Sequence, residues 1–310
     1  MEEKKNIIDL LNNKQILMHN LNSLIYGAIE IRETNSNKYI YVHYRKDGIS
    51  LTKYVGEYSE NLYNLILNNT IKAKQIKKKI KDIEKQLKSL NYTEAELEEK
   101  VEINIDFAKR HMVDTIYKQA VLEGIATTFA DTESIIEGGK VNNMTSEDIL
   151  KVVNLKHAWE FILNKNVIIS KTNFALLCEI NKIVEEGFYY SAGKVRSVPV
   201  SIGGTSWIPP LPIETVIREE LEEILESNKT ILDKAIDLLL YIMKRQIFID
   251  GNKRTAIIFI NHYLISMGKG IIVIPAEQTE EFKGMLVKYY EGVDEKEIKA
   301  FILNKCYIKI

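Results

Sequence analysis

Residues 246–256 read Gln-Ile-Phe-Ile-Asp-Gly-Asn-Lys-Arg-Thr-Ala, and this stretch indicates both the fold and the chemistry of the chain. Asp250 provides a carboxylate, which hard cations such as Mg²⁺ bind together with phosphate oxygens. Gly251 lets a ligand approach the backbone closely, and Asn252 is a preferred N-cap residue. The apolar run Ala256–Ser266 that follows predicts a buried helix.

The start of this predicted helix has the components of a polyphosphate site. Free backbone N–H groups and the positive end of the helix dipole favour an anion there, and Lys253 and Arg254 add two cations. An ordinary turn before a core helix, with a solvated aspartate and lysine, would have the same spacing. Spacing alone therefore leaves both interpretations open.

The order of the residues resembles the signature of the Fic/Doc (Fido) family, His-x-Phe-x-Asp/Glu-Gly-Asn-Gly/Lys-Arg. Phe248 and the stretch Asp250–Arg254 match it, whereas Gln246 occupies the position of the family histidine. The resemblance extends from about Asp131 to the C-terminus and implies a mainly α fold, a Fic-type helical bundle with a small β flap. It also implies transfer of AMP from ATP to a Ser, Thr or Tyr hydroxyl of a protein, with Mg²⁺ bound.

The family roles can be assigned to individual positions of this stretch. The resemblance implies that Asp250 holds Mg²⁺, that the backbone of Gly251 and Asn252 lines the anion site, and that Arg254 neutralises phosphate charge. The family histidine is the general base, and the amide of Gln246 cannot take that role because it has no useful basicity. Loss of a general base typically costs about 10²–10⁴-fold in rate.

Three functions remain open for such a variant: a nucleotide-binding pseudoenzyme, a slow transferase, and an enzyme whose base comes from elsewhere. His262 is expected to be a packed residue of the core helix rather than that base. Many family members have an arginine for the γ-phosphate at the position of Ile257. Doc-like members also lack it and are associated with phosphate transfer, so the orientation of the nucleotide is open. Lys253 is the candidate for a substitute point charge.

The segment 191–210 interrupts the helical pattern of the C-terminal two thirds. Its Gly, Pro and β-branched residues predict a loop with short strands. A plain surface loop is one interpretation. The segment also resembles the Fic flap, which pairs with a segment of the target protein as an added strand and so implies an unidentified protein partner. The matching residues are Gly193, Arg196, Ile202, Gly203, Pro209 and Pro210.

Residues 133–138, Glu-Ser-Ile-Ile-Glu-Gly, resemble the inhibitory motif of Fic proteins, Ser/Thr-x-x-x-Glu-Gly/Asn. Glu137 and Gly138 match the motif, whereas Glu133 stands at its Ser/Thr position. Since the usual arginine partner is absent, Glu137 is expected to pair with Arg254 and to compete with ATP. The alternative is a helix that simply ends at Gly138.

Residues 1–100 lie outside the resemblance and are expected to form an accessory module, with the Fic-like helical domain at 101–310. Ser59 predicts the start of a long helix with an apolar seam, and a capping box at Thr93–Glu96 predicts a second helix that returns antiparallel and continues through Val121. Three stretches rich in Tyr, Ile, Val and Thr predict a three-stranded antiparallel sheet: Ala28–Arg32, Lys38–Tyr44 and Ile49–Tyr54.

The charge and composition of the chain limit the classes of partner and the cellular location that are expected. The 310 residues have a formal net charge of −1, which provides no global field for nucleic acid or an anionic membrane. Eight lysines at 72–88 are expected to form a solvated helix face paired with the acidic run Glu94–Glu99, with a nucleic-acid module as the alternative. No apolar run approaches the ~20 residues of a membrane helix, and no signal-peptide core follows the N-terminus. With Cys178 and Cys306 expected to be reduced, a cytoplasmic protein is predicted, and exposed helical seams are compatible with a homodimer.

Overall fold

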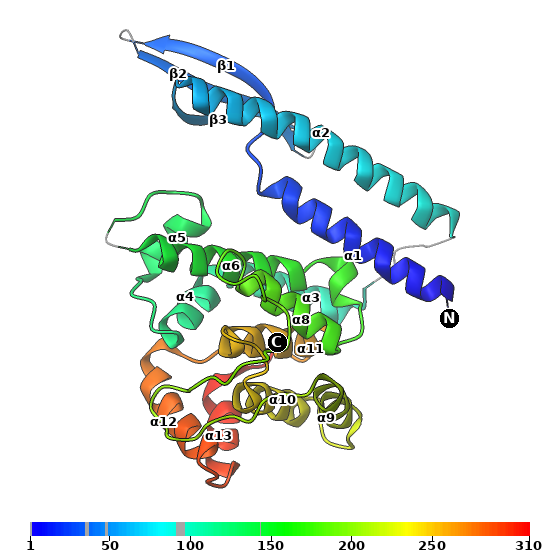
Figure 1. Cartoon of the computed structure of the whole chain (residues 1–310), viewed down its shortest axis with the longest axis vertical. Coiled ribbons are helices and arrows are strands. Elements are labelled where there is room, and N and C mark those ends of the chain that lie inside the picture. The colour runs from blue at the N-terminus through cyan, green and yellow to red at the C-terminus, as the bar shows by residue number, and fades with distance from the viewer. Residues whose placement is uncertain (1, 35–36, 47–48, 91–96, 143) are drawn as a thin grey trace. The chain divides into compact units, whose positions relative to one another are not determined.

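The computed structural model of the chain describes residues 2–34, 37–46, 49–90, 97–142 and 144–310 (Figure 1). The chain divides into two compact units, Met1–Glu94 and Ala95–Ile310. Within the described residues, no helix is both long enough and apolar enough to cross a membrane.

The described part of the first unit contains two helices and a small sheet. Helix α1 (Glu2–Asn22) precedes strands β1 (Ala28–Thr34), β2 (Asn37–Lys46) and β3 (Ile49–Glu57), and helix α2 (Glu60–Ser89) follows them. The strands pair antiparallel in the order β1-β2-β3. The structure thus confirms the three-stranded sheet expected from the β-branched and aromatic stretches.

One face of this sheet is covered by the start of α2. Ile40 and Val42 of β2 are buried together with Ile66 of α2, which gives three short strands the packing partner that they need. Ser59 caps α2 as predicted, since its hydroxyl accepts a hydrogen bond from the N–H of Leu62 at 3.2 Å.

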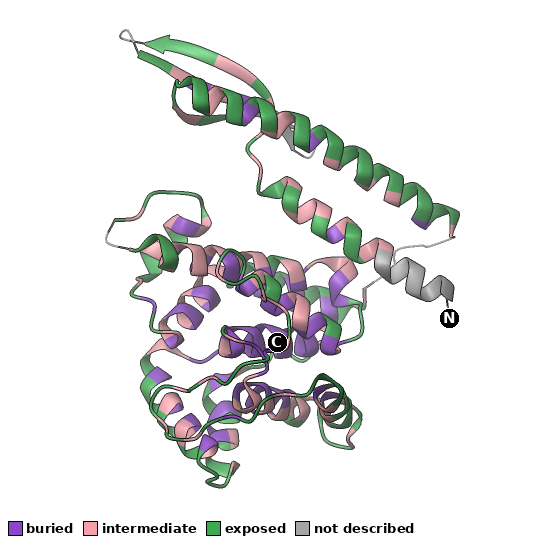
Figure 2. Cartoon of the chain, in the orientation of Figure 1, coloured by how far each residue is buried: buried purple, intermediate pink, exposed green. Residues whose placement is uncertain are grey.

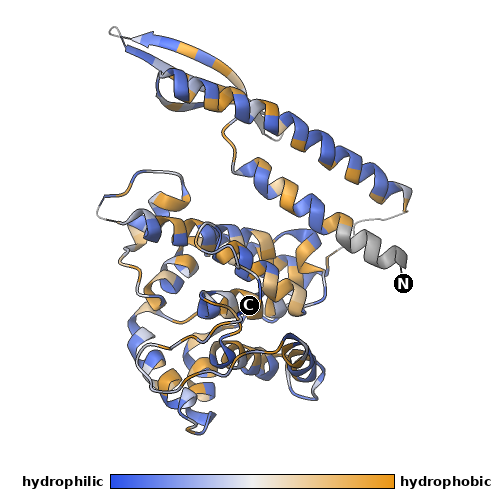
Figure 3. Cartoon of the chain, viewed as in Figure 1, coloured by the Kyte–Doolittle hydropathy of each residue, from blue (hydrophilic) through white to orange (hydrophobic). Residues whose placement is uncertain are grey.

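Helix α2 is mostly hydrophilic along its outer face (Figure 3), and all eight of its lysines at 72–88 are exposed. Its acidic residue Glu84 pairs with Lys14 of α1 at 3.0 Å. The expected capping box Thr93–Glu96, and part of the expected acidic run, lie outside the described residues. The described part of that run shows Glu98 paired with Lys100 at 2.8 Å.

The second unit is a helical bundle with one two-stranded sheet, in which β4 (Ile271–Ile272) pairs antiparallel with β5 (Tyr307–Ile308). The prediction of a single helix from Thr93 to Val121 is wrong, because His111 (φ −102°, ψ 12°) interrupts the helical conformation and separates α3 from α4. The helices of this unit are α3 (Glu99–Arg110), α4 (Met112–Leu122), α5 (Phe129–Ile136), α6 (Ser146–Ile162), α7 (Lys165–Ile168), α8 (Phe174–Val184), α9 (Glu214–Glu226), α10 (Ile231–Arg245), α11 (Asn252–Ser266), α12 (Thr279–Tyr290) and α13 (Lys296–Phe301).

Helix α11 is the centre of this unit. Every residue from Arg254 to Ile265 is buried (Figure 2), which confirms the buried helix predicted from its apolar run. It packs against α10, α8 and α6. Of the polar residues within it, Asn261 exchanges two hydrogen bonds of 2.8 Å with the backbone of Ile272 and so joins α11 to β4. A helix enclosed in this way holds its N-terminal turn in a defined position.

Candidate functional site

The site begins at Gln246, where α10 ends. This residue has φ 47° and ψ 61° and is the one non-glycine residue with positive φ in the described part of the chain. A side chain in the left-handed region costs roughly 1–2 kcal/mol, so the surrounding contacts must impose it. The sharp turn buries Ile247 and Phe248 and directs the chain into the first turn of α11.

Asn252 closes the loop between the two helices. Its Oδ1 accepts a hydrogen bond from the N–H of Phe248, and its Nδ2 donates to the Phe248 carbonyl, both at 2.9 Å. The predicted N-cap role of Asn252 is wrong, because Gly251 is the N-cap and Asn252 is already the first helical residue. The reason is that the Asn252 amide forms its hydrogen bonds with the backbone of Phe248 in the preceding loop, and not with the N–H groups of α11.

The side chain of Gln246 also braces this loop. Its Nε2 donates to the carbonyl of Met243 at 2.6 Å, and its Oε1 accepts from Nδ2 of Asn252 at 3.1 Å. Both ends of the amide therefore have partners within the protein. An amide held in this way supports the turn and contributes no basic group.

Arg196 ties the segment after α8 to the same turn. It is 2% exposed, and its Nε donates to the Gln246 carbonyl at 2.6 Å while its backbone N–H donates to the carbonyl of Ile247 at 3.0 Å. Its two terminal nitrogens donate to the carbonyls of Val198 and Pro210, each at 2.8 Å. Burial lowers the pKa of Arg196 from its ordinary value. One guanidinium thus fixes both ends of the predicted flap beside the 246–256 loop.

The short strands expected in the flap are not formed. Residues 197–213 are all described and contain no strand. The physical reason is that Arg196 takes carbonyls that a strand partner would use, and that the four prolines of this segment lack an N–H. Among the other predicted flap residues, Gly193 is held by Asn181, whereas Ile202 is half-buried and Gly203 is exposed.

Asn181 on α8 is a site residue that the sequence pattern did not indicate. Its Nδ2 donates to the carbonyl of Asp250 and to the hydroxyl of Thr255, both at 3.1 Å, and its Oδ1 accepts from the N–H of Gly193 at 2.9 Å. It is 1% exposed. A polar residue in the middle of an apolar helix is the one signal that could have singled it out.

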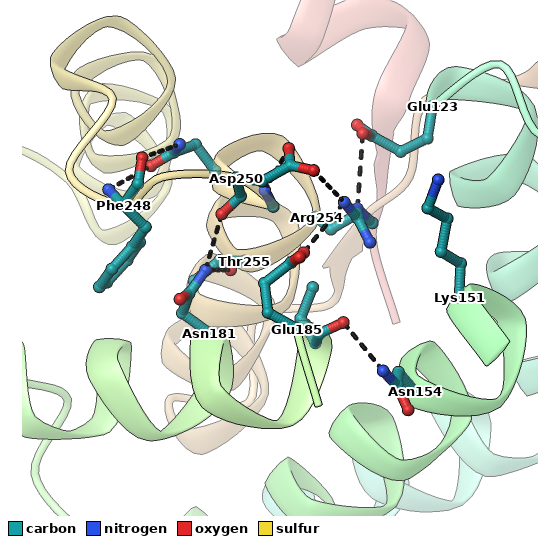
Figure 4. Close-up of polar contacts among 12 residues, drawn as sticks. Glu123, Lys151, Asn154, Asn181, Glu185, Phe248, Asp250, Arg254 and Thr255 are labelled. Carbon is teal, nitrogen blue, oxygen red and sulfur yellow. Dashed lines mark hydrogen bonds and ion pairs between the residues drawn. The ribbon is translucent and has the colours of Figure 1, made fainter. Parts of the chain in front are cut away.

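A cluster of charged groups surrounds Arg254 at the first turn of α11 (Figure 4). Its Nη2 lies 3.0 Å from Oε1 of Glu185 and 3.6 Å from Oδ2 of Asp250, and its Nε lies 3.5 Å from Oε2 of Glu123. Lys253 lies 3.5 Å from Oε1 of the same Glu123. The cluster is formed where the C-terminal ends of α4 and α8 meet the N-terminal end of α11, so three helices position it.

Glu185 is the most deeply buried acid of this cluster, with 2% of its surface exposed. Burial raises the pKa of Glu185 to about 7, an effect that outweighs the attraction of Arg254, and the charges of Asp250 and Glu123 raise it further. Neither carboxylate oxygen of Glu185 accepts a hydrogen bond within the described protein. Sequence reasoning missed Glu185 and Glu123, because each follows a helix as an ordinary polar residue would.

Asp250 differs from these two acids because its side chain is 51% exposed. Its Oδ1 accepts a hydrogen bond from the N–H of Gly251 at 2.7 Å, which orients the carboxylate beside the start of α11. Gly251 has φ 73°, and a Cβ at this position would lie 2.2 Å from Oε1 of Glu185, so glycine is required by both the backbone and the space. An exposed carboxylate, the buried cation Arg254 and a helix N-terminus therefore lie together.

Three other residues named from the sequence lie outside this cluster. Glu137 and Gly138 are exposed at the end of α5. The expected pair between Glu137 and Arg254 is absent from the described contacts, since the ion pairs of Arg254 are with the cluster above. His262 is fully buried, with its ring nitrogens 3.0 Å from the Thr172 hydroxyl and 2.9 Å from the Val167 carbonyl, as expected of a packed histidine.

Comparison with known proteins agrees with this arrangement. Residues 171–264 match the model of the Fic/DOC family, a region that contains α8, the flap segment, α9, α10 and most of α11. No curated protein matches the chain significantly.

Solved structures share the fold at low sequence identity. Fic-1 (residues 134–508) from C. elegans superposes with a TM-score of 0.53 at 16% identity, covering 76% of this chain and 72% of that one. A Fic domain-containing signaling protein from Bacteroides thetaiotaomicron gives 0.52 at 18%, covering 71% and 90%, respectively. A Fic family protein from Desulfovibrio desulfuricans gives 0.52 at 15%, covering 68% and 72%. Residues 171–264 of this chain are therefore a Fic/DOC family region within a helical unit that has the fold of Fic-domain structures.

Proposed function

We propose that the 246–256 loop binds a magnesium-complexed nucleoside triphosphate, ATP in the first instance, and that the chain is a protein adenylyltransferase or phosphotransferase slowed by Gln246. The observation that carries this proposal is the composition of the first turn of α11. There, a buried Arg254 and the half-exposed Asp250 flank the left-handed Gly251 at the positive end of the helix dipole.

The residues present fit both parts of this ligand. Nε and Nη1 of Arg254 make no hydrogen bond within the described protein, and Nε has only the longer contact of 3.5 Å with Glu123, so the N–H groups of both nitrogens can donate to phosphate oxygens. Asp250 has a hard carboxylate oxygen open to solvent, of the kind that Mg²⁺ takes while it keeps most of its waters. When bound, the ion would neutralise charge that develops on the phosphates. Lys253, with one third of its side chain exposed, would supply a further point charge.

Gln246 limits the rate of the reaction in this proposal. Transfer to a hydroxyl depends mostly on positioning and on charge stabilisation, which the other residues can still provide. Without a general base, we expect turnover about 10²–10⁴-fold below that of a histidine-containing site. Nucleotide binding should be retained, because the bracing contacts of Gln246 with Met243 and Asn252 keep the loop in place.

A nucleotide-binding regulator without turnover is the second candidate. It is favoured by the same two hydrogen bonds, which engage both ends of the Gln246 amide with protein groups rather than with a substrate hydroxyl. In either case the flap segment would present a target protein. Two free cysteines, Cys178 and Cys306, fit a reducing compartment, and we propose a cytoplasmic location.

Labelled ATP tests the first proposal. The wild type and Gln246→His are incubated with a lysate and with ATP labelled at the α- or γ-phosphate. Protein labelling that rises in Gln246→His supports the proposal, and the position of the label distinguishes AMP from phosphate transfer. Asp250→Ala in the Gln246→His background is the control. If nucleotide binds in calorimetry but neither variant labels any protein, the regulator is favoured, and absence of saturable binding contradicts both candidates.

A further inference from the structure

The charged cluster at the start of α11 has more acid than base. Three carboxylates, those of Glu123, Glu185 and Asp250, surround the two cations Lys253 and Arg254. With all five groups ionised, the cluster carries a charge of −1, although it lies at a helix end that favours anions. A site designed only to attract free phosphate would not combine these features.

The excess negative charge of the cluster comes from Glu185 at the place where a bound phosphate would have to lie. Its Oε1 is 3.0 Å from Nη2 of Arg254. A Cβ on Gly251 would lie 2.2 Å from the same oxygen, so the carboxylate is in direct contact with the N-cap of α11. A phosphate that approached the N-cap and the guanidinium would meet a buried negative charge at short range. In a buried location this repulsion is screened less than at the surface.

The other groups near Glu185 do not remove this charge. Lys151 on α6 acts on it through space, but its amine is paired with Glu147 at 2.7 Å. Asp250 and Glu123 add charge of the same sign. Neither oxygen of Glu185 has a hydrogen-bond partner within the described protein, and the ion pair with Arg254 involves Oε1. Burial, followed by the charges of Asp250 and Glu123, raises the pKa of Glu185 to about 7.

We propose that Glu185 determines which charge form of the ligand this site accepts: it favours a polyphosphate that carries a divalent cation and disfavours the metal-free anion. A cation held by the ligand would attract the carboxylates of Asp250 and Glu185 as well as the phosphates. It would therefore offset the repulsion between phosphate and carboxylate. Without the cation, the ligand must compete with Glu185 for Arg254. This inference rests on the proposed nucleotide function and assigns a specificity role within it.

The test compares ATP binding with Mg²⁺ and with EDTA in place of Mg²⁺, by calorimetry. Glu185→Gln keeps the shape of the side chain and removes the charge. We expect the ratio of the Kd without Mg²⁺ to the Kd with Mg²⁺ to fall about tenfold or more in this variant, since one like charge at close range is removed. Glu185→Ala should lower the ratio as well, and it provides a second neutral variant if the first folds poorly.

Glu179→Gln is the matched control. Glu179 is on the same helix α8, pairs with Lys182 at 3.1 Å and is partly exposed, so this change removes an equal charge outside the cluster. The ratio should stay at the wild-type value in the control. An unchanged ratio in Glu185→Gln, or an equal fall in Glu179→Gln, would overturn the inference while leaving nucleotide binding intact. If the wild type and Glu185→Gln bind no ATP under either condition, the proposed function fails and this inference fails with it.

Discussion

Arg254 and Glu185 form a buried ion pair in which Nη2 lies 3.0 Å from Oε1, with 3% and 2% of the two side chains exposed. The pair joins the first turn of α11 to the end of α8. A buried pair of this kind is weak as a source of stability, because the cost of desolvating both charges offsets their attraction. Because the pair lies beside the N-cap of the central helix α11, we expect it to affect ligand binding more than stability.

Glu185 should make stability depend on pH in a direction unusual for an acid. Its folded pKa of about 7 lies above the ordinary value of 4.5, so the folded state holds the proton more tightly than the unfolded state. The contribution of Glu185 to the free energy of unfolding is therefore fully present below pH 4.5 and is lost as the pH rises towards 7. The largest possible contribution of Glu185 to the free energy of unfolding is roughly 3 kcal/mol.

Urea unfolding of the wild type and Glu185→Gln at several pH values measures this contribution. The free energy of unfolding of the wild type minus that of Glu185→Gln should fall as the pH rises from 4.5 to 7, and it should stay constant above pH 7. A difference that is flat across the window would show that Glu185 ionises normally in the folded protein.

Gly251→Ala should destabilise the protein and remove nucleotide binding. The left-handed φ of 73° costs an alanine roughly 1–2 kcal/mol, and the new methyl group would overlap Oε1 of Glu185. Combining it with Glu185→Ala relieves the overlap but not the backbone strain. Thermal unfolding of both single variants and the double variant should therefore show a favourable coupling energy between the two positions. Strict additivity would contradict the close contact between them.

Arg196→Ala should release the flap segment from the 246–256 loop. The change leaves the carbonyls of Gln246, Val198 and Pro210 without their donor, and hydrogen bonds to a charged group contribute about 1.5–3 kcal/mol each. Hydrogen exchange should rise over residues 197–213, and the free energy of unfolding should fall. Arg196→Lys cannot reproduce the fork of donors and should resemble the alanine variant rather than the wild type.

His262→Leu should lower stability without affecting nucleotide binding. It removes hydrogen bonds to the Thr172 hydroxyl and the Val167 carbonyl within the core. Burial lowers the pKa of His262 to about 4, so wild-type stability contributed by the neutral ring is present above pH 6.5 and is lost as the pH falls towards 4. Chemical unfolding at pH 7 and pH 5 measures both effects, and a loss of ATP affinity at pH 7 would contradict the structural role.

Much of the fold follows from patterns that are local in sequence. The strands of the first unit, the cap at Ser59 and the buried helix α11 each depend on propensities and periodicities within a few residues. The break at His111 and the absence of flap strands were not predictable in this way. In the flap segment the outcome depends on hydrogen bonds with residues distant in the chain, such as the bond that Nε of Arg196 donates to the Gln246 carbonyl. At His111 the ring stacks on Phe107 and its Nδ1 lies 2.9 Å from the Phe107 carbonyl, a side-chain contact that helix propensity and periodicity do not indicate.

The sequence by itself determined the chemical groups of the candidate site, because Asp250, Gly251, Asn252, Lys253 and Arg254 are contiguous and open a helix. Only the tertiary structure decided what those groups face. The ends of α4 and α8 bring Glu123 and Glu185 against Arg254 across 131 and 69 positions of the chain, respectively, as their numbers show. Electrostatic interactions depend on distance in space and on burial, and neither quantity can be read from the order of residues along one loop.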